Sequence, residues 1–100
     1  MLNQIVLVGR LTENPTVENL EEGKAVATVT LAVSRSMKNA EGEYETDFIP
    51  CQLWNGIANN TAEYCKKGDI VGVKGRIQSA DGKLEIIAEK VTFLSSKKED

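Results

Sequence analysis

Two large aromatic side chains share one side of a predicted β-strand at residues 46–54. Phe48 and Trp54 are six residues apart, which at about 3.3 Å per residue separates their rings by roughly 20 Å on the same face. The alternate positions form an aliphatic face of Ile49, Cys51 and Leu53. Only one side of a strand can line the core of so small a domain. We therefore expect the aliphatic side to face inward and both rings to remain outside.

Exposed aromatic rings in this arrangement can stack on nucleobases. Every base has a π-face, so such stacking binds single strands with little sequence preference, at about 1–3 kcal/mol per base. Five basic side chains could neutralise phosphates beside the rings: Arg10, Arg35, Lys38, Lys74 and Arg76. Met37 is either a soft stacking contact or a loop residue tucked onto the domain, and the tucked form is favoured. Phe48, Trp54, Met37 and the five cations form the candidate binding set.

The residue pattern leaves a second interpretation equally open. Phe48 and Trp54 could pack under loops or in a subunit interface, because half-exposed aromatic residues often mark protein interfaces. Lys74 and Arg76, taken singly, are better explained as solvated side chains. The net charge of −3 also argues mildly against nucleic-acid binding, although most acidic residues cluster in two predicted loops. Tyr44 and Tyr64 are interpreted as loop and helix packing.

Most residue types that enzymes need are missing or unpaired. The sequence has no histidine, the commonest general base and metal ligand. Cys51 and Cys65 do not make a disulfide framework and are expected as buried free thiols. No phosphate-binding loop, CxxC pair or nucleophile elbow occurs. We expect no enzymatic activity, no metal and no cofactor.

The chain is expected to form one cytoplasmic domain. No apolar run approaches the roughly 20 residues needed to span a bilayer, and residues 1–4 lack the features of a signal peptide. The domain covers residues 1–94, and residues 95–100 form a polar tail that should fray.

Five strands and one short helix are predicted from the apolar periodicity. The strands cover residues 3–11, 24–35, 46–54, 69–78 and 83–94, and the helix covers residues 55–67. Asn55 is expected to cap the helix, and Gly68 suits the position just past its end. Residues 36–45 are expected to form a long loop. Three strands, a helix and two strands is the order of an OB-fold, an all-β Greek-key barrel of five strands.

Two positions predict irregular pairing in these strands. Pro50 cannot donate to a ladder, so the third strand should be irregular or locally unpaired there. The parity of the fifth strand switches, which indicates a bulge near Glu89 and Lys90. Asp81 and Gly82 predict a tight hairpin before it.

Several segments together resemble the bacterial single-stranded DNA-binding protein family. They are residues 1–12, 25–35, 47–54, 66–68 and 71–76, so the similarity covers nearly the whole chain. The resemblance implies a nucleoid-associated homotetramer that binds single-stranded DNA without sequence preference during replication, recombination and repair. It places Phe48 and Trp54 at aromatic positions of the family, and Arg10 and Arg35 at basic positions associated with DNA contact.

The sequence also departs from the family pattern. The family usually has an aromatic residue where Met37 stands, and Glu13, Glu18 and residues 55–56 fall where relatives are often basic. The hairpin at residues 78–83 is shorter than the usual aromatic-bearing arm. These changes favour weaker binding or a shorter footprint. The acidic, Phe-tipped tail that recruits replication and repair proteins in this family is absent before Asp100.

Two alternative functions remain open at this point. One is an OB-fold interaction module of a primosome-like complex, similar to the dimeric primosomal replication protein N, which the short length and acidic balance favour. The other is binding of single-stranded RNA, which residue types do not distinguish from DNA binding.

Overall fold

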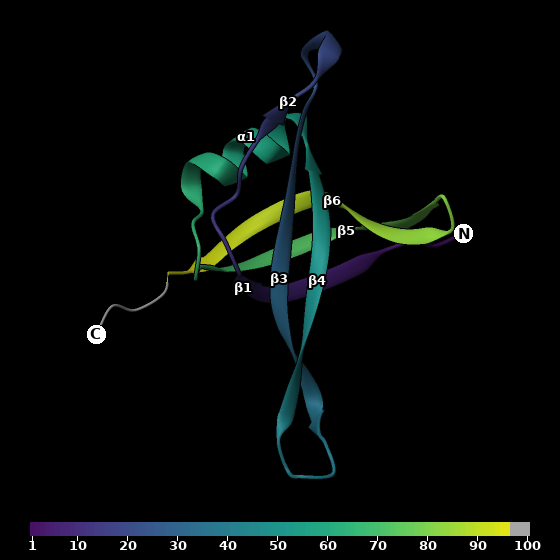
Figure 1. Cartoon of the computed structure of the whole chain (residues 1–100), viewed down its shortest axis with the longest axis vertical. Helices are drawn as coiled ribbons and strands as arrows, with labels where there is room; N and C mark the ends of the chain where they lie inside the picture. Colours follow the sequence, from purple (N-terminus) through teal and green to yellow (C-terminus); the bar gives the residue numbers. More distant parts are fainter. Residues whose placement is uncertain (97–100) are drawn as a thin grey trace.

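Five long strands close into a barrel in the computed structural model, which describes residues 1–96 (Figure 1). The elements are β1 (Ile5–Leu11), β2 (Glu18–Asn19), the 3-10 turn η1 (Glu21–Gly23), β3 (Ala25–Lys38), β4 (Tyr44–Trp54), α1 (Asn55–Tyr64), β5 (Ile70–Ala80) and β6 (Lys83–Ser95). Helix α1 joins β4 to β5, as expected for an OB-fold. Within residues 1–96, none of the helices has the length and apolar character to cross a membrane.

The barrel closes at two short seams. The strand order is β1-β5-β6-β4-β3-β2, with an additional pairing of β1 with β3. That pairing involves only Arg10 and Leu11 of β1, and the parallel pairing of β4 with β6 involves only Cys51 and Gln52 of β4. The β3–β4 and β5–β6 hairpins are antiparallel over most of their lengths. The barrel is therefore two long hairpins joined through β1 and a short parallel contact.

Alternate residues of the strands fill the barrel with small and branched aliphatic side chains. The core comprises Leu11, Ala27, Val29, Leu31, Cys51, Leu53, Ala58, Cys65, Val71, Val73 and Ala88. Cys51 and Leu53 of β4 are fully buried, and Ile49 packs partly buried against them. The inward direction of the aliphatic face of β4 is confirmed, and so is the period-two pattern of β3.

A β-bulge interrupts the pairing of β5 with β6. Gly75 lies opposite Ala88, whereas the preceding β5 residue lies opposite Lys90, so Glu89 is the extra residue. The predicted bulge is thus confirmed. A side chain at Gly75 would overlap the carbonyl oxygen of Ile87, which explains why glycine occupies this position.

The expected loop at residues 36–45 is wrong. Both strands continue past the barrel, because β3 extends to Lys38 and β4 begins at Tyr44. We call residues 35–47 the hairpin arm, and Figure 1 shows it projecting below the barrel. The side-chain oxygen of Asn39 accepts backbone hydrogen bonds at 3.0 Å from Glu41 and Glu43, and Gly42 has a φ of 79°. A five-residue turn built on Asn39 therefore replaces the loop.

The boundaries of the helix also differ from the prediction. Helix α1 ends at Tyr64 rather than Lys67, because Cys65 adopts an extended conformation and buries its side chain. Asn55 has a φ of 52° and does not cap the helix with its side chain. Its Oδ1 instead accepts a hydrogen bond of 3.0 Å from the backbone N–H of Ala25, which ties the start of the helix to β3.

Pro50 does not disturb the ladder between β3 and β4. It lies opposite Thr30 within an unbroken register, so the expected irregularity at this position is wrong on the β3 side. The register shift lies farther out, between Ser34 and Lys38. Ser95 of the predicted tail belongs to β6, and the tail from Lys97 lies outside the described residues.

Candidate nucleic-acid interface

The outer face of β4 carries both predicted stacking residues. Phe48 is 66% exposed, and Trp54 is half-buried. Both side chains alternate with the inward-facing Cys51 and Leu53, so they lie on the side of β4 that faces away from the core. Two rings on one strand and outside the barrel are the geometry that stacking requires.

Trp54 forms one wall of a groove of about 480 Å³. We call it the Trp54 groove; its lining residues are Lys24, Gln52, Trp54, Asn55, Arg76, Gln78 and Ile87. The indole Nε1–H donates a hydrogen bond of 3.2 Å to the side-chain oxygen of Gln52. The groove thus combines an aromatic ring with two cations and three amide side chains, a mixture suited to a base and its phosphate.

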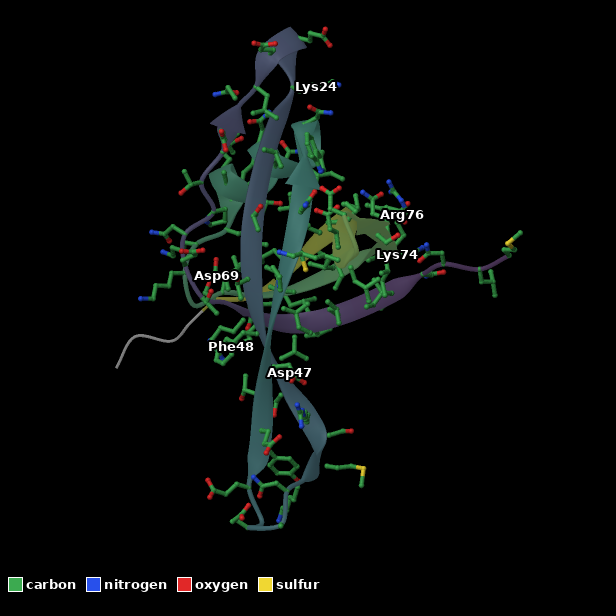
Figure 2. All side chains as sticks on the ribbon, turned by 45° about the vertical axis from the view of Figure 1, so that its right-hand side comes forward. Lys24, Asp47, Phe48, Asp69, Lys74 and Arg76 are labelled. Atoms are coloured by element: carbon green, nitrogen blue, oxygen red, sulfur yellow. The ribbon has the colours of Figure 1, made fainter. Side chains whose placement is uncertain are left out.

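Lys74 and Arg76 lie on the same side of β5. Figure 2 shows them together to the right of β4, away from Phe48. Arg76 lines the Trp54 groove and makes an ion pair of 3.6 Å with Glu89, in which both side chains are about half exposed. Such exposed pairs are weak, so the guanidinium can exchange this carboxylate for a phosphate at little cost.

Arg10 lies in one row with Phe48 across three strands. Arg10 of β1 is opposite Ala32 of β3, which in turn is opposite Phe48 of β4. The Nη1 of Arg10 donates a hydrogen bond of 2.6 Å to the carbonyl of Gly68. This contact anchors the guanidinium and leaves further N–H donors for an anion.

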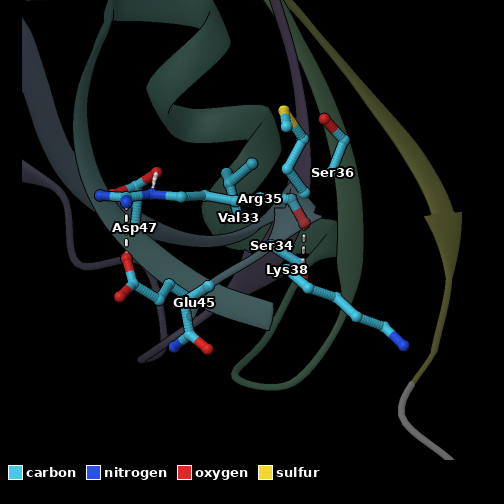
Figure 3. Close-up of a pocket in the computed structure, with 9 residues that line it drawn as sticks. Val33, Ser34, Arg35, Ser36, Lys38, Glu45 and Asp47 are labelled. Carbon is cyan, nitrogen blue, oxygen red and sulfur yellow. Dashed lines mark hydrogen bonds and ion pairs between the residues drawn. The ribbon is translucent and has the colours of Figure 1, made fainter. Parts of the chain in front are cut away.

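Arg35 is bound by two carboxylates rather than free (Figure 3). Its Nε and Nη2 donate to the two oxygens of Asp47 at 3.0 and 2.9 Å, and Nη1 lies 2.5 Å from Glu45. The hydrogen bond to Asp47 raises the pKa of Arg35 and lowers the pKa of Asp47. A phosphate would therefore compete with Glu45 and Asp47 for the Arg35 guanidinium, and the sequence did not reveal these ion pairs.

The hairpin arm carries the remaining predicted residues at its surface. Met37 is 79% exposed, so the tucked form favoured from the sequence is wrong. The Nζ of Lys38 lies 5.7 Å from the centre of the Tyr44 ring. Tyr44 is 56% exposed on β4 rather than packed in a loop, and Tyr64 of α1 is also exposed. The predicted residues of the hairpin arm, Arg35, Met37 and Lys38, are therefore not among those that line the Trp54 groove.

Five groove residues are absent from the set of binding residues predicted from the sequence: Lys24, Gln52, Asn55, Gln78 and Ile87. Gln52 has the same parity as Trp54, and Gln78 the same parity as Arg76, so strand alternation contained a signal for both. Lys24 directly precedes β3 and has the same parity as Val26, which lies opposite Trp54. Its place in the groove therefore follows from the pairing of β3 with β4.

Both cysteines are buried in the barrel, as expected. Burial raises the pKa of Cys51 to about 11. Burial, together with the nearby Asp69 carboxylate, also raises the pKa of Cys65. Neither thiol has the lowered pKa of a nucleophile.

Comparisons with known proteins agree with this architecture. The sequence model of the Single-strand binding protein family matches residues 2–94. Single-stranded DNA-binding protein B of Bacillus subtilis is 48% identical over 106 aligned positions, which cover 97% of this chain and 94% of that protein. Single-stranded DNA-binding protein 3 of Listeria innocua is 50% identical, and the match covers 97% of this chain and 66% of that protein.

A solved structure supports the fold alone. A deletion mutant of the single-stranded DNA binding protein from Thermus aquaticus superposes with a TM-score of 0.77 at 24% identity, over 94% of this chain and 51% of that chain. This chain thus spans about half the length of that protein and about two thirds of the Listeria relative. The family match covers nearly the whole barrel, including both seams and the outer face of β4. The chain belongs to the Single-strand binding protein family.

Proposed function

We propose that this chain binds single-stranded DNA without sequence preference, by stacking bases on Phe48 and Trp54. The observation that carries the proposal is the placement of both rings on the outer face of β4, in a member of a family of single-strand binding proteins. The family is one of binding proteins rather than enzymes, in agreement with the absence of catalytic motifs in the sequence.

The cations divide into two groups in this proposal. Arg10, Lys74 and Arg76 hold phosphates beside the two rings, and Lys24 joins them at the Trp54 groove. Lys38, Met37 and Arg35 of the hairpin arm contribute less, because Glu45 and Asp47 hold the Arg35 guanidinium and line the same surface hollow as Met37 and Lys38. The cellular role is protection of single strands during replication, recombination and repair, in the cytoplasm and at the nucleoid.

Trp54 makes the proposal directly testable, because it is the single tryptophan of the chain. Titration with oligo-dT should quench its fluorescence, and added salt should weaken binding because phosphate contacts release counterions. Graded oligonucleotide lengths would report the footprint in the same experiment. Absence of quenching at low salt would count decisively against the proposal.

Replacement of the ring tests its contribution. Trp54→Ala should weaken binding of a fluorescein-labelled oligo-dT by about 1–3 kcal/mol, the range of one base stack. The matched control is Tyr64→Ala, which removes an exposed ring from α1, away from β4. An equal effect of both variants would show that Trp54 has no special role.

We further propose a homotetramer as the assembly. Val6 and Val8 of β1 are 64% and 54% exposed, an apolar surface that a second copy would cover. Only Arg10 and Leu11 of β1 pair with β3, so its edge before Arg10 is open within the described residues. A dimer similar to primosomal replication protein N is the competing assembly, and the comparisons do not favour it. The alternative of single-stranded RNA binding is tested by competition: poly-U that displaces labelled oligo-dT from the protein would indicate that RNA also binds.

A further inference from the structure

A chain of hydrogen bonds runs from the indole of Trp54 to a carboxylate on another strand. The Nε1–H of Trp54 donates to Oε1 of Gln52 at 3.2 Å. The side-chain nitrogen of Gln52 donates in turn to Oε2 of Glu85. Gln52 and Trp54 belong to β4, and Glu85 belongs to β6, beside the short parallel seam of the two strands.

These two hydrogen bonds fix the orientation of the Trp54, Gln52 and Glu85 side chains. Both ends of the Gln52 amide are engaged, so its oxygen is directed at the indole and its nitrogen at the carboxylate. A hydrogen bond to an ionised acceptor is stronger than one between neutral groups. All three side chains are partly buried, which limits competition from water. The indole is therefore held by its N–H edge, and rotation of the ring is restricted.

The location of Glu85 is otherwise unfavourable for a DNA-binding surface. It lies opposite Gln78, a residue of the Trp54 groove, and that groove also contains Arg76. A carboxylate here repels phosphates and weakens the field of the cations. Its hydrogen bond to Gln52 supplies a physical reason for its presence.

We propose that Glu85 is a positioning residue for Trp54, which through Gln52 holds the indole in the orientation that stacks on a base. The inference rests on the proposed function of single-stranded DNA binding. It assigns to an acidic residue a favourable effect on the binding of a polyanion. The effect acts through the orientation of a ring and not through charge.

Two variants separate the hydrogen-bond acceptor from the charge. Glu85→Gln and Glu85→Met both remove the charge and keep a similar length, but only Gln retains an oxygen that accepts from Gln52. Loss of one such hydrogen bond should make Glu85→Met bind labelled oligo-dT about two- to tenfold more weakly than Glu85→Gln. Glu85→Gln should bind as tightly as the unmodified protein or more tightly. Equal affinities of the two variants would overturn the proposal.

The fluorescence of the free protein gives a second readout that a merely structural role would not move. Glu85→Met should lower the steady-state anisotropy of Trp54 in the folded protein, because the ring gains freedom, and Glu85→Gln should leave it unchanged. The control pair is Glu63→Gln and Glu63→Met on α1, outside the groove, which should not alter the anisotropy. This readout needs no DNA. An unmodified protein that failed to bind oligo-dT would refute the proposed function, while the anisotropy would still decide whether Glu85 orients the ring.

A double-mutant cycle tests whether the effect passes through the indole. Trp54→Phe retains a ring that stacks but lacks the N–H group, so it disconnects the ring from Gln52. In this background the difference in affinity between Glu85→Met and Glu85→Gln should disappear. If the difference persisted, Glu85 would act by another route, and the assignment would be wrong.

Discussion

At the scale of single residues, the environment of Arg35 determines how much of its charge a ligand can use. Asp47 holds its guanidinium at two points and Glu45 at a third. A phosphate that approaches the hairpin arm must displace at least one of these carboxylates. The arm also carries Glu41 and Glu43, so acidic groups outnumber basic ones there. The guanidinium of Arg35 therefore neutralises acidic groups of the hairpin arm, and in the proposed function it contacts DNA only where a phosphate displaces one of them.

Asp47→Asn should release Arg35 and tighten binding of oligo-dT. We expect a several-fold increase in affinity, and a salt dependence steeper by about 0.7 in log–log slope, the value for one additional phosphate contact on a single strand. The measurement is a titration of labelled oligo-dT over a series of salt concentrations. Glu41→Gln is the matched control, because it removes the same charge from the same arm without freeing Arg35. The same slope in both variants would mean that only net charge matters.

The pair of Arg35 and Asp47 also predicts a pH dependence of stability. The hydrogen bond from Arg35 lowers the pKa of Asp47 in the folded protein below its value in the unfolded chain. Its contribution is therefore present above the unfolded pKa of about 4 and is lost as pH falls through the folded value. Urea midpoints of the unmodified protein and of Asp47→Asn should differ at pH 7, and the difference should shrink as the pH falls through the lowered folded pKa of Asp47. A difference that grew in acid would contradict this sign.

At the scale of elements, the sequence predicts the strand segments that line the core and misses the strand segments that extend beyond it. The alternation of β3 and β4 is strong inside the barrel, since buried positions must be apolar. Residues 36–45 are polar and acidic, so they resembled a loop. The two strands nevertheless pair with each other beyond the barrel, and Asn39 organises their turn. Strand pairing outside the barrel needs no apolar face, so the sequence of these residues shows no alternation of apolar and polar positions.

The bulge of β6 makes a sharp prediction at this scale. Gly75→Ala should destabilise the protein by about 1–3 kcal/mol, because the new methyl group would overlap the backbone of Ile87. Gly72→Ala on the same strand is the control, since its nearest neighbour would be the Leu94 Cδ1 at 3.7 Å, an ordinary contact. Thermal unfolding followed by circular dichroism compares the two. Equal midpoints would show that the bulge can shift to accept a side chain.

At the scale of the whole molecule, the count and order of elements were sufficient to predict the barrel. The candidate site was only partly predictable. Parity placed Phe48 and Trp54 outside correctly, because it is a property of one strand. The Trp54 groove brings together β4, the start of α1, β5, β6 and the residue before β3, and the ion pairs of Arg35 depend on the register of the arm. Contacts between distant strands have no signature in a single sequence.

The proposed assembly is also tested at this scale. Sedimentation velocity should give the mass of four chains of 10.9 kDa each. Val6→Lys combined with Val8→Lys should shift the distribution toward smaller species, because charges on an apolar interface are costly to bury. Val6→Thr combined with Val8→Thr keeps the β-branched shape without charge and should have a smaller effect. An unmodified protein that sediments as a dimer would favour the primosome-like alternative.

No side chain from residues 35–47 belongs to the core of the barrel. Substitutions there leave the packing of the core unchanged, whereas substitutions of core residues create cavities or overlaps. Within one short chain, packing of the core thus depends on the barrel residues, and the hairpin arm can vary separately. In the proposed function, substitutions in the hairpin arm can therefore change the affinity for DNA, while the strand that carries Phe48 and Trp54 keeps its structure.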